Sequence, residues 1–528
     1  MAIAGVGEVE VRSGTMTDDE QRRIFSVIGT LPEPGGYAVA KFSRSARPYQ
    51  EWIQELTQEG ASRFYEQFYF AYGHASIADL AHVTMVAENI SIVAAVEVLD
   101  EQLVDAQESS TRYQDFSRRR YYTPPEIADS PLASRYRELC DRLFDLYHGV
   151  HQAVVHHFER RYSDQRPVSM ADDEYRRTLR ARAFDVGRYL LPSSTYTGLG
   201  YLCSARTLER QISRLAAHSL REIRDIAGEL RQSAVEPAYN PRAIALEPEL
   251  ESFLGANASV AAEAFGQKVR EAAMVGAAAA PTLVRYTQPS TYPNATYGAA
   301  RTMIQGLLDE SRPDGDRGVE LAAIVPPPIE LAATLGYRVS PLSYRQIAEQ
   351  LARRSDPEID ALGEVAFANR GPHDDPVRES RVGYQLVFDL CLDDGAFRDL
   401  HRHRNCVQII KDFTPEYGYD TPDALAEAGQ VPAYRAAMDE AGELAGRLEE
   451  QQAGLGQYAL PLAFRRRALF KMDAAELGYI VETRTGPAGH FSYREIAYEM
   501  YRAFESRYPS LARHVRVTTP EVEEFFER

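Results

Sequence analysis

Arg402, His403 and Arg404 place three cation-capable side chains next to one another in a chain whose formal net charge is -18. Arginine guanidinium groups are permanently charged planar forks that suit phosphate, and an imidazole adds a donor or a stacking surface. A metal site on His401 and His403 is disfavoured because the flanking arginines would repel a dication. A solvated basic helix face stays open as an alternative. The sharper interpretation is an anion-binding site.

A second polar segment, QESSTRYQDF, lies at residues 107–116. Its small hydroxyl side chains supply donors, its arginine supplies a fixed charge, and its glutamate supplies an acceptor. This composition suits a monophosphate or nucleotide loop, although a plain polar loop after a helix would have the same composition. The candidate binding residues of this segment are Glu108, Ser110, Thr111, Arg112 and Tyr113.

A third polar cluster, YGHASIADLAHVT, lies at residues 72–84. His74, Ser76 and Asp79 are expected at the start of a helix. A serine at the N-cap followed three residues later by an acid is a capping pattern, which explains these side chains without a ligand. Because one side chain can both cap a helix and bind a ligand, both interpretations stay open.

The whole chain limits the class of function. Its 528 residues predict two or more domains. The acidic balance argues against nucleic acid as a partner, because backbone binding needs a basic surface. Without an apolar run of about eighteen residues or a signal-like N-terminus, we expect a cytoplasmic protein with no membrane segment. The four cysteines lie far apart and no zinc or P-loop spacing occurs, so no metal is predicted.

Three pairs of similar segments recur in the same order, which predicts an internal duplication. The first pair reads as a short strand ended by a proline turn, and the last pair reads as amphipathic helices near a histidine. The pairs are 38–49 with 282–293, 190–192 with 459–461, and 219–230 with 492–504.

A stretch of small residues that ends in proline, at 274–282, indicates a linker between the two copies. We therefore place an N-terminal domain at 1–275 and a C-terminal domain at 276–528. The second domain carries an insert at about 310–350, whose prolines predict an ordered loop or an extended segment. Helical periodicity dominates and short strands occur in each copy, so the predicted fold class is α+β, helix-rich with antiparallel sheet.

Together these segments resemble the flavin-dependent thymidylate synthases (ThyX). That family carries an Arg-His-Arg triplet, then seven residues, then a serine, with an Arg-Tyr pair two residues later. In the first copy, Glu108, Ser110, Arg112 and Tyr113 match the second part of the motif, but residues 100–102 are Asp, Glu and Gln where the triplet would stand. The resemblance implies two tandem ThyX-like domains that share one motif.

The second copy shows the reverse. Residues 402–404 match the triplet, while Asp412 and Thr414 replace the serine and the arginine of the motif. Asp399 stands where the family usually has a glutamine, three residues before the triplet. This departure leaves open which pyrimidine nucleotide is the substrate.

Four further arginines match the family's pattern. Arg484 falls at the substrate-binding arginine of the family, and Arg214 is its nearest equivalent in the first copy. Arg188 and Arg206 match arginines that face the substrate and the flavin, respectively.

The resemblance implies reductive methylation of dUMP to dTMP, with FAD as cofactor and with NADPH and methylenetetrahydrofolate as co-substrates. Arg402 and Arg484 are then the catalytic residues that polarise the pyrimidine. The implied substrate-binding residues are Glu108, Ser110, Thr111, Arg112, Tyr113, Arg188 and Arg214. The implied cofactor-binding residues are His403, Arg404, His74, Ser76, Asp79 and Arg206.

The resemblance also implies an assembly. Because the family builds each site from several subunits, we expect a homodimer of the fused chain that forms a pseudo-tetramer. Composite sites would combine residues 402–404 with residues 108–113, and the opposite combination would be inactive. Two alternatives stay open: a methylase of another pyrimidine nucleotide such as UMP, and a non-catalytic nucleotide- or flavin-binding relative.

Overall fold

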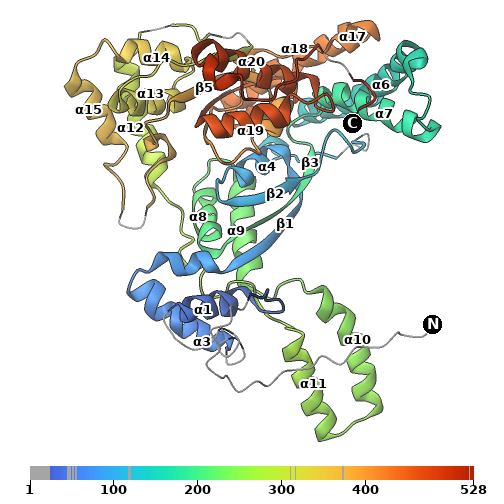
Figure 1. Cartoon of the computed structure of the whole chain (residues 1–528), viewed down its shortest axis with the longest axis vertical. Helices are drawn as coiled ribbons and strands as arrows, with labels where there is room; N and C mark the ends of the chain where they lie inside the picture. The colour runs from blue at the N-terminus through green and yellow to red at the C-terminus, as the bar shows by residue number, and fades with distance from the viewer. Residues whose placement is uncertain are drawn as a thin grey trace.

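The computed structural model describes residues 24–43, 49, 53, 56–116, 120–309, 311–314, 317–371, 374–521 and 524–527. Two antiparallel sheets, each flanked by helices, organise the described chain. In Figure 1 the first sheet lies below the second, with the long helices α6 and α7 beside the second. The predicted α+β class, with two helix-rich domains in tandem, is confirmed, whereas the boundary near residue 275 stays a prediction.

The first half of the chain holds the three-stranded sheet. Its elements are α1 (Pro32–Phe42), α3 (Gln58–Tyr65), the π-helix η1 (Glu66–Ala71), the 3-10 helix η2 (Ala75–Leu80), β1 (His82–Ser91), α4 (Ile92–Leu99), β2 (Val104–Glu108), α5 (Pro125–Ala128), α6 (Ala133–Tyr162), η3 (Ser163–Gln165), α7 (Asp172–Gly187), η4 (Arg188–Leu190), β3 (Tyr196–Ser204), α8 (Ala205–Ala216), α9 (Arg221–Val235), α10 (Pro241–Ala256) and α11 (Val260–Ala272).

The second half holds the four-stranded sheet. Its elements are α12 (Tyr292–Leu307), β4 (Gly318–Leu321), α13 (Pro327–Val339), α14 (Tyr344–Leu351), α15 (Asp356–Val365), the 3-10 helix η5 (Arg378–Ser380), β5 (Leu386–Asp393), α16 (Asp394–Leu400), β6 (Val407–Ile410), η6 (Pro415–Tyr417), α17 (Asp423–Glu427), α18 (Val431–Gln451), η7 (Leu455–Ala459), β7 (Arg465–Met472), α19 (Ala474–Arg484), α20 (Phe491–Arg507) and α21 (Pro509–Ala512).

The same order of elements occurs in both halves. The sheet orders are β1-β3-β2 and β4-β5-β7-β6, so β1, β2 and β3 correspond to β5, β6 and β7. In each half a polar residue at the end of a strand caps the next helix. Ser91 Oγ accepts the amide of Ala94 at 3.0 Å, and Asp393 Oδ1 accepts the amide of Ala396 at 2.8 Å. These caps satisfy orphan amide donors and start α4 and α16 at equivalent positions.

The two halves meet through reciprocal backbone hydrogen bonds. The amide of Ser193 donates to Leu460 O at 2.9 Å, and the amide of Leu462 donates to Leu191 O at 3.0 Å. These bonds fall on the LLP and ALP segments that the sequence paired. Because each bond repeats the other with the halves exchanged, the two halves are related here by a local two-fold axis.

The two sheets differ in how their faces are covered. All eight residues of β5 are buried, and Val387, Val407 and Ile409 pack in one core with residues of α12–α15. On β1, burial alternates instead, and the side chain of Val86 is 68% exposed. The first sheet therefore keeps one face open in the described chain.

Two local predictions are wrong. Residues 38–42 belong to helix α1, and residues 282–291 form no strand before α12 begins, while residues 44–48 lie outside the described part of the chain. The alternation of these short segments does not distinguish a strand from the side of an amphipathic helix. The insert contains the strand β4, but it also contains the helices α13 and α14, which the prediction excluded. Pro327 and Pro328 are compatible with α13 because they lie in its first turn, where no amide donor is needed.

Candidate functional site

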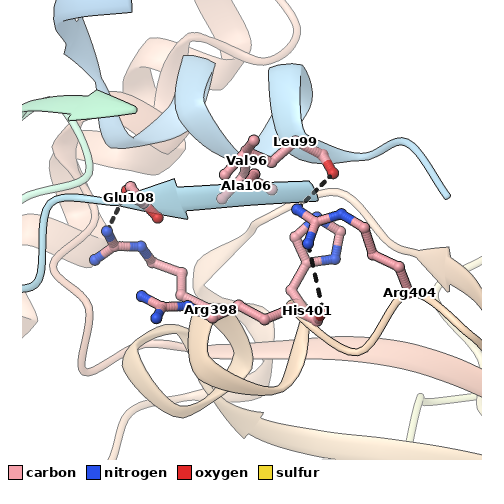
Figure 2. A pocket seen from close by; sticks show the side chains of 8 residues that line it. Val96, Leu99, Ala106, Glu108, Arg398, His401 and Arg404 are labelled. Atoms are coloured by element: carbon pink, nitrogen blue, oxygen red, sulfur yellow. Dashed lines mark hydrogen bonds and ion pairs between the residues drawn. The ribbon is translucent and has the colours of Figure 1, made fainter. Parts of the chain in front are cut away.

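The junction between α4–β2 and α16 joins the two halves of the split motif. Glu108, at the end of β2, forms an ion pair with Arg398 of α16 and accepts a hydrogen bond from Thr197 Oγ1 at 3.3 Å. Both members of the ion pair are buried. Figure 2 shows the pair beside α4 and β2. A residue of the first half is thereby tied to the helix that precedes the triplet.

Arg112 reaches into the second half from the loop that follows β2. Its Nε donates to Asp185 Oδ1 at 2.7 Å, its Nη1 donates to the Tyr493 hydroxyl at 2.9 Å, and its Nη2 donates to Ala488 O at 3.2 Å. Burial disfavours the guanidinium charge, but Asp185 outweighs burial and raises the pKa of Arg112. Arg112 is therefore a fixed charge held at the junction.

The side chains of Arg188 and Asp399 form a second buried pair across the junction, with Nη1 and Oδ2 3.0 Å apart. Burial opposes ionisation of Asp399, but Arg188, Arg112 and Arg402 together lower its pKa to about 2. The Nε and Nη2 atoms of Arg188 have no hydrogen-bond partner in the described chain. Asp399, which replaces the glutamine of the resembled family, therefore places a carboxylate next to Arg188, an arginine whose hydrogen-bonding capacity is only partly used.

His403 holds Arg484. The Arg484 Nε donates to His403 Nε2 at 2.8 Å, and the Arg484 guanidinium lies 5.5 Å from the ring centroid of Tyr493. Burial, together with Arg484 and Arg402, lowers the pKa of His403 to about 3, so this imidazole is neutral. Since Tyr493 also contacts Arg112, the two family arginines from different halves share one aromatic neighbour.

Arg404 lies against the first half. Its Nε donates to Glu101 O at 3.1 Å and its Nη2 donates to Leu99 O at 3.4 Å. Among the contacts of the described residues, none engages the side chain of Arg402. These arginines border a hollow, the junction hollow, which also appears in Figure 2 and is lined by Val96, Leu99, Ala106, Glu108, Arg398, His401, Arg402 and Arg404.

The other residues of the 107–116 segment lie around Arg112. Ser110 Oγ accepts the Arg112 amide at 3.2 Å, Thr111 is buried, and Tyr113 is exposed with its ring centroid 5.8 Å from the Arg112 guanidinium. The segment is therefore a turn that presents Arg112.

The first half has an acidic counterpart of the triplet. Strands β2 and β6 hold the same register against their partners, which places residues 100–102 where the second half has residues 402–404. Asp100 pairs with Arg378 at 2.5 Å, and Glu101 pairs with Arg214 at 2.9 Å. Glu101 takes the place of His403 in the first half. It binds Arg214, just as His403 binds Arg484 in the second half.

The third polar cluster lies apart from the triplet. Asp79 pairs with Arg206 at 3.1 Å and accepts from Ser204 Oγ at 3.4 Å, next to η2. His74 and Ser76 are exposed, and the N-cap of η2 is His74 rather than Ser76. Within the described chain, no hydrogen bond or ion pair joins this cluster to residues 402–404.

Three residues of the junction were missed from the sequence. Arg398 lies within four residues of the triplet, so its closeness in sequence to Arg402 could have drawn attention to it, although α16 ends at Leu400, before the triplet. Asp185 and Tyr493 carry no such signal, because they become neighbours of Arg112 only through packing of α7 and α20. Among the described residues, no group of three or more His, Cys, Asp or Glu is placed to hold a metal ion. In that same part of the chain, no helix is long and apolar enough to span a membrane.

The fold and the junction define a tandem α+β protein with one arginine-rich site between two related halves. The chain belongs to the family described as thymidylate synthase complementing protein, whose model matches residues 31–238 and 384–510.

Relatives extend over most of the chain. The UPF0159 protein Ta1429 of Thermoplasma acidophilum is 26% identical over 513 residues, which cover 90% of this chain and 93% of the relative. A UPF0159 protein of Chlamydia muridarum is 26% identical over 464 residues, 86% of this chain and 81% of the relative. A crystal structure of the flavin-dependent thymidylate synthase ThyX from Helicobacter pylori, complexed with FAD and dUMP, is 14% identical. It aligns with 38% of this chain and 89% of that chain, at a TM-score of 0.23.

Proposed function

We propose that this protein is a flavin-dependent thymidylate synthase that methylates dUMP to dTMP, with methylenetetrahydrofolate as the one-carbon donor and NADPH as the reductant. One observation carries the proposal beyond family membership. Arg112 of the first part of the split motif contacts Tyr493, which also contacts Arg484. Arg484 in turn donates to His403 of the triplet, so both parts of the motif lie around one set of contacts in a single chain.

The residues at the junction fit a flavin. Val96, Leu99 and Ala106 offer apolar surface for a planar ring, and Arg402 and Arg404 add positive charge beside it. The hollow itself is only large enough for a water-sized group, so a flavin would lie across its mouth rather than inside it. A bound FAD would supply the hydride that reduces the one-carbon unit on C5 of the pyrimidine. His403 and Arg404 are the side chains that would hold it.

The chain's own residues bind and polarise the nucleotide. We assign Arg402 and Arg484 to the pyrimidine, where negative charge develops on attack and a guanidinium would stabilise it. Neutral His403 accepts from Arg484 Nε and thereby fixes the orientation of its guanidinium. Arg112 and Ser110 hold the phosphate, together with Thr111.

We assign one such site to each chain. In the acidic counterpart, carboxylates repel a phosphate, and the arginines there are already paired with them. The five paired side chains of the counterpart are Asp100, Glu101, Arg210, Arg214 and Arg378.

We also propose that two chains form a homodimer through the open face of the first sheet. The equivalent face of the second sheet is covered by α12–α15, so the first needs a cover from outside the described chain. In that assembly His74, Ser76, Asp79 and Arg206 would complete the adenosine side of the partner's flavin site.

Titration of the purified protein with FAD and dUMP tests the function and the stoichiometry together. We expect a yellow protein that binds one FAD and one dUMP per chain. Arg402→Ala should abolish dUMP binding, because we assign this charge to the pyrimidine, whereas Arg435→Ala, an exposed arginine on α18, should not. A colourless protein that FAD cannot reconstitute would favour the non-catalytic alternative, and two FAD or two dUMP molecules per chain would contradict the single site.

Asp399 favours a second candidate, methylation of another pyrimidine nucleotide such as UMP. Its carboxylate accepts hydrogen bonds but cannot donate them, unlike the amide that the family has at this position. Growth rescue of a thymidine auxotroph supports dUMP, whereas turnover of UMP without rescue supports the second candidate.

A further inference from the structure

Arg182, on helix α7, connects the C-terminal tail to the loop that follows Arg484. The tail, defined here as residues 524–527, offers three carbonyl acceptors to its guanidinium, and the loop, residues 485–490, offers two. The acceptors are Phe525 O at 3.0 Å, Glu527 O at 3.0 Å, Glu524 O at 3.2 Å, Pro487 O at 3.3 Å and Gly489 O at 3.3 Å.

The loop determines where the arginines of the junction lie. It starts directly after Arg484, gives Ala488 O to Arg112, and ends at the residue that caps α20, the helix that carries Tyr493. A side chain at Gly489 would come within 2.8 Å of the Arg494 Cγ, so the backbone passes through a closely packed space. A shift of this loop would therefore move Arg112, Arg484 and their shared tyrosine.

Aromatic stacking fixes the tail on α6 and α7. The rings of Phe525 and Tyr162 stack with centroids 3.8 Å apart, and the rings of Phe526 and Tyr175 stack at 5.8 Å. The Arg182 guanidinium lies 5.6 Å from the Phe525 ring centroid. Figure 1 places the C-terminus beside α6 and α7. The tail is thus anchored at one end of a continuous set of contacts that reaches the junction.

We propose that the C-terminal tail and Arg182 form a positioning element for the nucleotide site. The stacked phenylalanines hold the tail, the tail carbonyls orient Arg182, and Arg182 holds the loop that sets Arg112 and Arg484. The element touches neither nucleotide nor flavin. This inference rests on the proposed function for its effect on binding, but its mechanical part, the restraint of the loop, does not.

Two measurements on the full chain test the positioning element. In hydrogen exchange of the free protein, Phe525→Ala should speed exchange of the loop amides, those of residues 485, 486 and 488–490, about tenfold or more. In titration with dUMP, the same variant should weaken binding about tenfold, because misplaced contact groups lose affinity steeply, while the absorbance spectrum of bound FAD stays unchanged. Phe525→Tyr keeps the stack and should restore both. Arg516→Ala removes an exposed ion pair with Glu482 in the same C-terminal segment and serves as the matched control.

The outcomes separate this inference from the function. Unchanged exchange of the loop in Phe525→Ala overturns the positioning element, whatever the protein binds. Faster exchange with unchanged dUMP affinity also overturns it, since the loop would then move without consequence. If the unaltered protein binds neither FAD nor dUMP, the proposed function fails, and the exchange result alone decides whether the tail restrains the loop.

Discussion

At the scale of residues, three arginines of the junction are paired with buried carboxylates. A buried ion pair gains little net stability, because desolvation of both charges offsets their attraction, but loss of one partner leaves a costly charge. The pairs are Arg112 with Asp185, Arg188 with Asp399, and Arg398 with Glu108. Arg404 donates to backbone carbonyls and Arg484 to His403. The side chain of Arg402 has neither a hydrogen bond nor an ion pair in the described chain, so its charge is the one most available to an anion.

Asp399 is the residue whose replacement should strengthen nucleotide binding. Asp399→Asn keeps the shape of the side chain but removes the charge that neutralises Arg188. We expect dUMP to bind several-fold more tightly, because Arg188 then attracts the phosphate, while the unfolding free energy falls by about 3–5 kcal/mol. Calorimetric titration and thermal unfolding measure the two effects. Asp439→Asn, at an exposed carboxylate, is the control, and weaker dUMP binding by Asp399→Asn would refute the charge argument.

At the scale of elements, the 3-10 helix η5 closes the acidic counterpart. Arg378 Nη1 contacts Asp100 and also donates to Gln408 O at 3.0 Å, and its Nη2 donates to Asp100 O at 2.9 Å. Arg378 of the second half thereby brings a positive charge to residues 100–102, which lack the two arginines of the triplet. The counterpart is held together as structure, which fits its proposed loss of ligand binding.

Arg378→Met should destabilise the fold without changing ligand number. Burial opposes ionisation of Asp100, but Arg378 and Arg214 lower its pKa, so this carboxylate depends on its cationic partners. Its loss should cost about 3–5 kcal/mol in denaturant unfolding. The double variant Arg378→Met with Asp100→Asn should recover much of that loss, as a double-mutant cycle would show. A loss of bound FAD in Arg378→Met would instead make the counterpart part of a binding site.

At the scale of the whole molecule, the two halves are related by a local axis, but the equivalent faces of their sheets are covered differently. Helices α12–α15 cover the second sheet, whereas the equivalent face of the first sheet exposes Val86 and Leu202, at 68% and 51%. The described chain therefore has one covered sheet face, in the second half, and one open sheet face, in the first half.

Val86→Arg should convert the proposed homodimer into single chains. A buried arginine without a partner would be too costly at a subunit interface, and the exposed face tolerates it in the monomer. Light scattering should report half the mass, with an unchanged circular dichroism spectrum. Val168→Arg, at a fully exposed valine in a loop, is the control. A Val86→Arg protein of unaltered mass would place the interface elsewhere.

Much of the site was predictable because its chemistry resides in residue types at short spacings. Arg402, His403 and Arg404, and the segment around Arg112, are recognisable from adjacent residues, and the strand register confirms that residues 100–102 replace the triplet in the first half. The predicted strands at 38–49 and 282–293 failed because short alternating segments take their conformation from tertiary packing.

The sequence by itself determined the class of fold, the two-fold repeat and the complementary losses in its two motifs, since these are properties of residue order. Only the tertiary structure decided that Arg112 and Arg484 share Tyr493, that Asp399 neutralises Arg188, and that the tail holds Arg182. The physical reason is that such contacts join residues far apart in the chain. Their formation depends on how the helices pack across the local axis, which no local spacing records.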